Sequence, residues 1–520
     1  MASTFFGLTI SYSGLQSAQA ALNVTAHNIS NINTEGYSKQ QSVQQAAPAL
    51  RTYYRGGALG SGVMVTQIKQ LRDSYYDTKY RNNNSNYGQF TTKSSYMNQI
   101  QDYLDEYTLQ GFSTEYKNFF SAVEQVKNQP EEASTRNQLI NNAKSLADYF
   151  NTLSTNLRNV QIDANNEVKD AVQQINSIAN NIASLNKQIN QVETTYGNAN
   201  DLRDQRNKLI DDLSQIVNVD VTETDLGYNM TELSIYINGQ VLVSGNNYNT
   251  LEVVSRDDTK RNASDAEGLY DIQWDSGQNF NIYSDSLGGH LRALIDIRDG
   301  CNSQIEAYKK DADGNFITDS DGNKVYETQS SDIKNTDYKG IPYYQAQLNY
   351  FISTFSQAVN DVLKSGYSYD GKYKGESLFV TVTGADTLNA STVTVNPDLI
   401  KNADKLAVKD SASTGQANSQ LVSRLQQVEK AKIFNGGVGS YFLESIVGDM
   451  AIDTNNADNM VDNYNNLKDS IQNQRLSVMG VDTEEEGMDM LKFQQAYNLN
   501  SKMLSIMNEV YDKLINQTGI

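Results

Sequence analysis

The chain has 520 residues and a mass of 57.9 kDa, and its 62 acidic and 42 basic residues give a formal charge of −20 at pH 7. A protein this acidic is repelled by phosphate backbones, which excludes nucleic acid as a general partner. Cys301 is the only cysteine, so no disulfide can form within the chain.

The first 34 residues contain no Lys, Arg, Asp or Glu. They lack the basic leader of a signal peptide, and their many Ser, Gln and Asn residues exclude a membrane span, so we expect no membrane partner and export without a cleaved signal. Apolar residues recur every seven positions, which predicts an amphipathic helix with a neutral polar face. We expect this stripe to become buried on assembly; it consists of Leu8, Leu15, Leu22 and Ile29.

The helix runs into the stretch TAHNISNINTEGYSKQ, residues 25–40, which is rich in turn formers. Asn and Gly tolerate the left-handed backbone that a chain needs on leaving a helix. We therefore predict that a turn motif consists of Asn28, Asn31, Asn33, Gly36 and Tyr37. His27 is interpreted as a polar helix residue, since the only other histidine is His290 and no cysteine lies at metal-ligand spacing.

Residues 167–193 carry two apolar series with a period of seven residues, which predicts a helical coiled coil. Its predicted core comprises Val168, Ile175, Ile178, Ile182, Leu185 and Ile189. After a turn near Gly197 the helical pattern resumes as far as Ile216, which indicates a long antiparallel pair. The pattern leaves open whether this core lies within one subunit or between subunits.

From Val217 the pattern alternates, as in TELSIYINGQVLVSG, and Asn238-Gly239 predicts a tight hairpin turn. Helical patterns return at residues 287–307 and again from residue 341, and a second short β region covers about 367–395. Residues 308–340 are rich in Asp, Gly, Asn and Thr and predict an exposed hairpin or loop. The predicted fold class is mixed and mainly α, with paired terminal helices, a long helical coiled-coil domain and β-rich insertions in the middle of the chain.

The last 40 residues predict another helix. Thr483 resembles its N-cap, and Glu484 to Glu486 follow in the first turn, where carboxylates meet the positive end of the helix dipole. A second predicted assembly stripe consists of Leu499, Met503, Ile506 and Val510. The predicted domains are therefore 1–50 with 480–520 as the terminal α-helical assembly domain, 51–220 with 287–307 and 341–479 as a helix-rich domain, 221–286 as an inserted β-rich outer domain, and 308–340 as an exposed insert.

Nothing in the sequence favours catalysis, a metal or a cofactor. No HExxH motif occurs. The stretch DADGNFITDSDGNK resembles a calcium loop, but Phe316 replaces the required glycine and no glutamate stands at the twelfth position. An enzyme in the central insertion, such as a wall hydrolase, stays the less favoured alternative.

Stretches at both ends and in the interior of the chain carry a resemblance. TAHNISNINTEGYSKQ is similar to the N-terminal motif of flagellar axial proteins, the rod and hook superfamily, and EEEGMDMLKFQQAYNLNSKMLSIMNEVYDKLI is similar to their C-terminal motif. Interior stretches resemble the hook-associated protein 1 family of hook–filament junction proteins; they are GSGVMVTQIKQLRDSYYDTKYR, INSIANNIASLNKQI, DLRDQRNKLIDDLSQIV, GGHLRALIDIRD and FISTFSQAVNDVL.

This resemblance implies a non-enzymatic, extracellular subunit of the bacterial flagellum, exported by the flagellar type III apparatus. It implies an adaptor ring at the junction between hook and filament that filament assembly requires. The implied partners are further copies of the chain, the hook protein, a second junction protein (hook-associated protein 3) and a flagellar export chaperone. Another axial structural protein, a hook or rod subunit, stays the alternative.

Overall fold

The structure is a computed structural model. It describes residues 6–51, 58–104, 111–195, 197–227, 230–256, 264–301, 305–308, 317, 326–329, 338–382, 387–413 and 419–517. The chain forms two compact units. The first comprises residues 1–87, 173–251 and 463–520, and the second comprises residues 88–172 and 252–462. The mainly α fold class with β insertions in the middle of the chain is confirmed. The four predicted domains are a different partition and stay a prediction.

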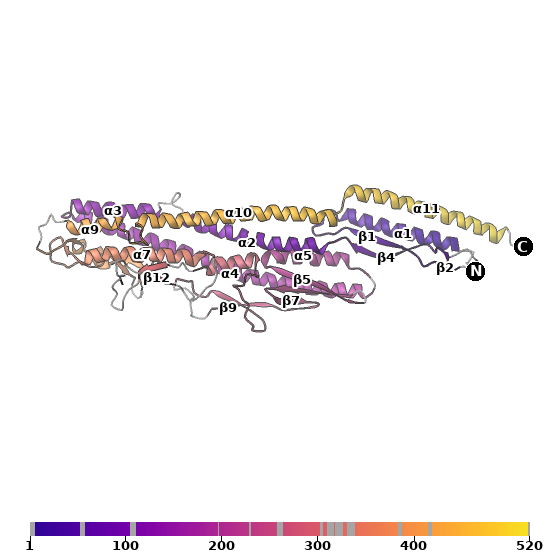
Figure 1. Cartoon of the computed structure of the whole chain (residues 1–520), viewed down its shortest axis with the longest axis horizontal. Helices are drawn as coiled ribbons and strands as arrows, with labels where there is room; N and C mark the ends of the chain where they lie inside the picture. Colours follow the sequence, from indigo (N-terminus) through magenta and orange to yellow (C-terminus); the bar gives the residue numbers. More distant parts are fainter. Residues whose placement is uncertain are drawn as a thin grey trace. The chain divides into compact units, whose positions relative to one another are not determined.

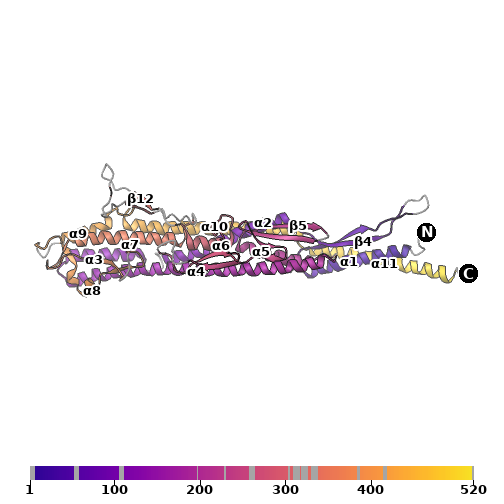
Figure 2. The ribbon, with the colours of Figure 1, turned by 90° about the horizontal axis from the view of Figure 1, so that it is seen from below.

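The first unit contains the two terminal helices, α1 (Phe6–Ser30) and α11 (Thr483–Asn516), which lie side by side (Figures 1 and 2). It also contains α5 (Asn200–Ile216), together with residues 74–87 of α2 (Ser74–Leu104), residues 173–193 of α4 (Ala133–Glu193) and residues 463–479 of α10 (Gly439–Met479). Acidic residues occupy the first turn of α11, as predicted, but its N-cap is Asp482 rather than Thr483. The Asp482 side chain accepts hydrogen bonds from the backbone N–H groups of Glu484 and Glu485, an arrangement that Thr483 cannot provide from inside the helix.

A β hairpin follows α1, and the sequence pattern did not predict it. Strand β1 (Gln40–Ala46) pairs antiparallel with β4 (Val63–Gln70), and β2 (Leu50–Arg51) pairs with β3 (Ala58–Leu59) farther along the hairpin. Both β1 and β4 lie along α1 (Figure 1). The register of β1 against β4 shifts between Val43 and Gln44, which interrupts the period-2 pattern that would have indicated strands.

The predicted β insertion begins as a four-stranded antiparallel sheet of β5 (Val219–Gly227), β6 (Met230–Ile237), β7 (Gln240–Ser244) and β8 (Asn247–Tyr248). The predicted turn between β6 and β7 is confirmed, since Asn238 and Gly239 have φ values of 50° and 74°. Both central residues of a type I′ turn need positive φ, and Asn-Gly is the pair that adopts it most easily. The sheet is tied to α4 by the Asn186 side chain, which donates a hydrogen bond to the Gly245 carbonyl.

The six predicted coiled-coil residues lie on α4; four of them are buried and two are half-buried. Val168, Ile175, Ile182 and Ile189 are at most 1% exposed within the single chain, whereas Ile178 and Leu185 are half-buried. The helix after the turn near Gly197 is α5, and Arg206 on α5 donates a hydrogen bond to the side-chain oxygen of Asn186 on α4. These four side chains therefore have their burial partners inside one subunit.

Replacing Ile182 with asparagine should lower the free energy of unfolding of the first unit by about 3 to 5 kcal/mol, because the change leaves a cavity and buries an amide in an apolar site. Urea unfolding followed by circular dichroism measures it. The matched control is Lys187→Asn on the exposed face of α4, which should change stability by less than about 0.5 kcal/mol. Equal effects of the two substitutions would contradict the assignment of Ile182 to the core.

The second unit holds the remaining elements. Its helices are α3 (Phe112–Asn128), α6 (Gly289–Asp299), α7 (Ile341–Lys364), α8 (Pro397–Lys401) and α9 (Gln420–Gln427), with the other parts of α2, α4 and α10. Its strand pairs are β9 (Leu251–Ser255) with β10 (Tyr270–Trp274), β11 (Ile305–Tyr308) with β12 (Tyr326–Gln329), β13 (Tyr367–Ser368) with β16 (Ala407–Lys409), and β14 (Phe379–Thr381) with β15 (Val393–Val395).

An aromatic cluster forms the core of the second unit and includes Phe119, Phe351, Phe355, Phe379 and Phe434, each at most 2% exposed. Most of the insert predicted at 308–340 lies outside the described residues, and so does the calcium-like stretch at 311–324 except for residue 317. The antiparallel pair of β11 and β12 brackets that insert.

Candidate assembly site

The two terminal helices meet along a seam with a repeat of seven residues. A Cβ atom added to Gly7 would lie 2.5 Å from Cε of Met507, and one added to Gly14 would lie 2.5 Å from Oδ1 of Asn500. One further repeat along α1 reaches Ala21, which is buried. Because each step of seven residues forward on α1 matches a step of seven backward on α11, the helices are antiparallel and in fixed register. Only small side chains on α1 allow so close an approach.

The seam ends in a polar layer that consists of Asn28 on α1 and Glu486 on α11. Asn28 Nδ2 donates to Oε1 of Glu486 at 3.1 Å and to the carbonyl of Gln40 at 2.9 Å, while its Oδ1 accepts from Gln40 N at 2.9 Å and from the hydroxyl of Tyr37 at 2.8 Å. All four hydrogen-bonding positions of the amide are occupied. A buried, hydrogen-bonded polar pair at the end of the seam fixes register, because any shift would leave both groups buried and unpaired.

Lys39 forms ion pairs with Glu486 and with the neighbouring Glu485. Lys39 Nζ lies 3.2 Å from Glu486 Oε1 and 2.7 Å from Glu485 Oε2. Burial opposes a charge on Lys39, but the hydrogen bonds to Glu485 and Glu486 outweigh burial and raise the pKa of the amine. The backbone N–H of Lys39 also donates to the carbonyl of Met479 at 2.8 Å, which ties the segment before β1 to the end of α10.

The predicted turn residues have different roles from one another. Gly36 has φ +81°, so the left-handed backbone expected of this turn is found there. The same expectation is wrong for the asparagines, none of which has positive φ; Asn28 and Asn31 act instead through their side chains, and Asn31 donates to the carbonyl of His27 at 3.0 Å. Burial, with the carboxylates of Asp201, Asp204 and Glu486 nearby, raises the pKa of Tyr37, so its hydroxyl stays protonated and can donate to Asn28.

The predicted assembly residues lie outside the seam. On α1, Leu8, Leu15, Leu22 and Ile29 each follow a seam residue by one position and are half-buried. On α11 the exposed fractions are 68% for Leu499, 49% for Met503, 45% for Ile506 and 45% for Val510. We call these four residues the outer stripe of α11. In the single chain, the α11 residues that meet α1 are half-buried, with Glu486 fully buried, and a second, apolar face of α11 is left in water.

A buried ionic network that sequence reasoning missed lies where α2, α5 and α10 meet. Its members are Arg72, Asp77, Arg81, Asp204, Asp211 and Arg475. Three guanidinium groups face three carboxylates, so the network is charge-balanced. The stretches LRDSYYDTKYR and DLRDQRNKLIDD contain most of these residues, and their Arg and Asp spacing was the available signal, but neither stretch identifies its partner.

Arg475 on α10 links two of the carboxylates. Its Nε lies 2.7 Å from Asp77 Oδ1 and its Nη2 lies 2.6 Å from Asp211 Oδ2. Burial alone would raise the pKa of Asp77, but the charges of Arg72, Arg475 and Arg81 hold it below its ordinary value. Ionised Asp77 therefore stabilises the folded state at neutral pH, whereas burial outweighs the hydrogen bonds from Ser38 and the charge of Arg72 at Asp204 and raises the pKa of that carboxyl.

Replacing Arg475 with leucine should lower the free energy of unfolding by about 3 to 5 kcal/mol at pH 7, because buried carboxylates lose a partner. Since the folded-state pKa of Asp77 is depressed, the stabilisation is present above its ordinary pKa of about 4 and is lost as pH falls through the folded value. The difference between wild type and variant should therefore shrink below about pH 4. Urea unfolding at several pH values measures it, with Lys187→Leu as the exposed control; a difference independent of pH would contradict the prediction.

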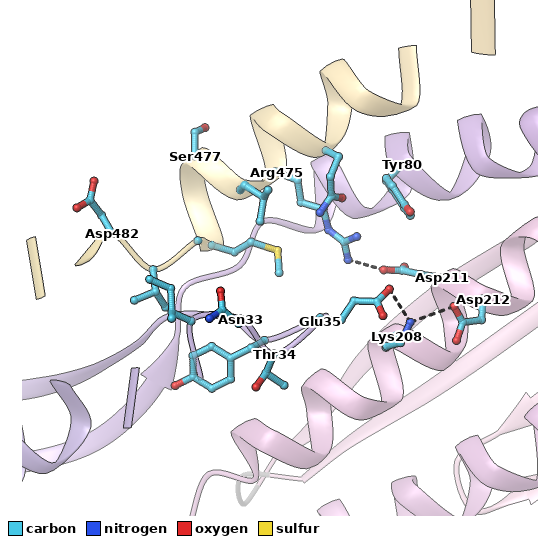
Figure 3. A pocket seen from close by; sticks show the side chains of 18 of the residues that line it. Asn33, Thr34, Glu35, Tyr80, Lys208, Asp211, Asp212, Arg475, Ser477 and Asp482 are labelled. Atoms are coloured by element: carbon cyan, nitrogen blue, oxygen red, sulfur yellow. Dashed lines mark hydrogen bonds and ion pairs between the residues drawn. The ribbon is translucent and has the colours of Figure 1, made fainter. Parts of the chain in front are cut away.

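A cleft of about 750 Å³ lies between the turn after α1, the side of α5 and the corner where α10 turns into α11 (Figure 3). Asn33, Thr34 and Glu35 approach it from the turn, and Lys208 and Asp212 from α5. Lys208 Nζ lies 2.8 Å from Glu35 and 3.4 Å from Asp212. Hydrogen bonding to Glu35 raises the pKa of Lys208, which keeps this cation charged at the edge of the cleft.

His27 Nδ1 lies 3.0 Å from the hydroxyl of Tyr37, and its Nε2 lies 3.7 Å from Asp201. Within the described ranges, no three His, Cys, Asp or Glu side chains come together as metal ligands would. A search of the same ranges for helices with the length and hydropathy of a bilayer span finds none.

Comparisons with known proteins match three parts of the chain. The family model of the flagellar hook-associated protein FlgK helical domain matches residues 97–379, more than half of the chain. A flagella basal body rod protein model matches residues 8–37, which hold most of α1 and the turn. The flagellar basal body rod FlgEFG protein C-terminal model matches residues 472–517, which hold the corner and α11.

Full-length relatives are also similar. Flagellar hook-associated protein 1 of Bacillus subtilis is 28% identical over 100% of this chain and 99% of its own length. The proteins of the same name from Escherichia coli and Salmonella typhimurium are 28% and 27% identical, each over 97% of this chain and 98% of its own length. The structure of the flagellar hook junction protein FlgK from Burkholderia pseudomallei covers 77% of this chain and 100% of its own, with a TM-score of 0.57 and 15% identity, a likeness of fold.

Proposed function

The chain belongs to the FlgK family of flagellar hook-associated proteins, structural components of the flagellum at the hook–filament junction, and from that premise we propose that it forms the adaptor ring between hook and filament. In this role the protein has no catalytic activity. Copies of the chain form the ring, the hook protein lies on one side, and a second junction protein, hook-associated protein 3, lies on the other. The chain reaches this place outside the cell through the flagellar export apparatus, with a chaperone holding it before export.

The observation that supports this function best is the two-faced character of α11. Its inner face is fixed against α1 by the seven-residue seam, and its outer stripe leaves four large apolar side chains 45% to 68% exposed. Exposed apolar rows of this kind mark association surfaces. Fully burying an exposed aliphatic side chain contributes about 1.5 to 3 kcal/mol, and each of these four side chains is about half exposed, so each can still contribute part of that gain to contact between copies.

A hook or rod subunit is the alternative within the same superfamily. The rod-protein models match only the two ends of the chain, whereas the FlgK model matches the long interior. The helices and strand pairs of that interior, residues 97–379, lie outside the parts that match the rod-protein models. The junction role is therefore preferred.

Electron microscopy of cells that lack this protein tests the function. The expected result is hooks without filaments, with filament subunits released into the medium. Complementation with the wild-type gene should restore filaments. Normal filaments in the deletion strain would rule out the junction role.

A further inference from the structure

The cleft at the α10–α11 corner carries an excess of negative charge. Its lining includes five acidic side chains, Glu35, Asp211, Asp212, Asp482 and Glu485, against two basic ones, Lys208 and Arg475. Arg475 is held inside the buried network by Asp77 and Asp211, and Lys208 is shared between Glu35 and Asp212. Glu35 itself is 82% exposed at the mouth. Glu485 is paired with Lys39, and Asp211 is paired with Arg81 and Arg475. The remaining carboxylates, Glu35, Asp212 and Asp482, have only Lys208 among them, so a cationic group entering the cleft would meet excess negative charge there.

Two amides in the cleft have unused hydrogen-bonding capacity. Asn33 belongs to the turn motif, yet no described residue forms a hydrogen bond with its side chain, in contrast to Asn28 and Asn31. The side-chain oxygen of Gln472 is enclosed by protein and accepts no hydrogen bond from the described residues. An enclosed acceptor is costly unless a donor reaches it, and an ammonium group supplies up to three donors.

The rest of the lining suits the stem of a long side chain. Ile32, Leu476, Met479 and Val481 contribute apolar surface beside these polar groups. Lysine combines an apolar four-carbon stem with a compact cationic head, so it matches both parts of the lining. The chemistry of the cleft therefore fits a lysine side chain from outside the subunit.

Lysines of this kind stand on the outer face of α11. Lys492, Lys502 and Lys513 are exposed and share the helix face of the outer stripe. Lys492 already lies 3.6 Å from Asp489. Lys502 forms no ion pair with a described residue, and it lies between Leu499 and Ile506, in the middle of the stripe.

We propose that the cleft of one subunit receives Lys502 of a second copy when the ring assembles. This inference rests on the proposed function and names a contact that self-assembly uses. Each copy has a formal charge of −20, so copies repel one another at long range, and a local contact between opposite charges offsets that repulsion and orients the encounter. The cleft and the lysine lie on different surfaces, and a contact between different surfaces repeats from copy to copy, as a ring requires.

A charge swap tests the proposal. Glu35→Lys and Lys502→Glu should each lower the self-association constant of the full-length protein by about tenfold, and the double variant should recover to within about threefold of wild type. Sedimentation velocity over a range of protein concentrations measures the constant. Circular dichroism and urea unfolding of every variant show that the fold is retained, which is expected because Glu35 and Lys502 are both exposed.

The matched controls are Glu124→Lys and Lys187→Glu, which make the same changes at exposed helix positions away from the cleft and the stripe. Both should associate as wild type does. The proposal is overturned if either test variant associates normally, if the double variant is as defective as the singles, or if the controls are equally defective. The two proposals can fail separately. If the purified protein self-associates and follows the charge swap, but cells that lack the protein still make filaments, the junction role is rejected and the contact is retained.

Discussion

Replacing Gly14 with leucine should separate α1 from α11. The Cβ position at Gly14 already lies 2.5 Å from Oδ1 and 2.8 Å from Cγ of Asn500, so a larger side chain has no space while the seam keeps its register. Overpacking of this kind costs about 1 to 3 kcal/mol, whereas glycine to a better helix former on an exposed face gains about 1 kcal/mol. Hydrogen exchange of the full-length protein should show amides of both terminal helices exchanging at least about tenfold faster, with the second unit unchanged.

The direction of the change in hydrogen-exchange rate shows whether Gly14 is packed against α11. Asn23→Leu places the same side chain on the exposed face of α1 and should leave hydrogen exchange unchanged or slower. Gly14→Ala should weaken the seam, and adding Asn500→Ala should restore it, because the second substitution removes the atoms that the new methyl group meets. Slower exchange in Gly14→Leu would show that the helices are not packed through this residue.

Placing aspartate at both Leu499 and Ile506 should abolish self-assembly while the single chain stays folded. The two side chains are 68% and 45% exposed, so their loss should change the free energy of unfolding by less than about 0.5 kcal/mol each. Fully burying an exposed aliphatic side chain contributes about 1.5 to 3 kcal/mol, and only about half of each of these two side chains is still exposed, so assembly gains roughly 2 to 3 kcal/mol from the pair. Aspartate replaces this gain with a desolvation cost. We expect association to weaken by more than about a hundredfold, and cells carrying the variant to release filament subunits.

The matched control for the added charge uses Ser501 and Asn508, which are both exposed on α11 but lie away from the outer stripe and the seam. Ser501→Asp with Asn508→Asp adds the same charge to the same helix and should assemble normally. Assembly of the stripe variant at wild-type level would reject the outer stripe as the interface.

Much of the fold could be predicted because its signals are local. The seven-residue series of α4, the alternation of β6 and the Asn238-Gly239 turn each depend on residues close in sequence, and all three elements are present. The β1–β4 hairpin was missed because its strands are rich in glutamine and their register shifts at Val43. The hairpin packs along α1, and its own sequence carries no signal of that partner.

The seam shows why the site was predicted only in part. The leucine series of α1 is conspicuous, but the residues that meet α11 are Gly7, Gly14 and Ala21, one position earlier, whose small size carries no hydrophobic signal. The α11 residues that meet Gly14 and Asn28 are Asn500 and Glu486, which a search for apolar periodicity counts as polar. The ionic network and the cleft combine residues more than a hundred positions apart, and no local pattern specifies such pairings.

Antiparallel pairing of α1 and α11 has a practical consequence for anyone labelling this molecule. It brings the beginning of α1, at Phe6, next to the last turns of α11, where Gly7 meets Met507. An epitope or fluorescent fusion attached before α1 or after α11 would therefore lie at the same end of the helix pair. The exposed turn at Gly277, where an added Cβ meets nothing within 4 Å, is the better insertion point for a reporter.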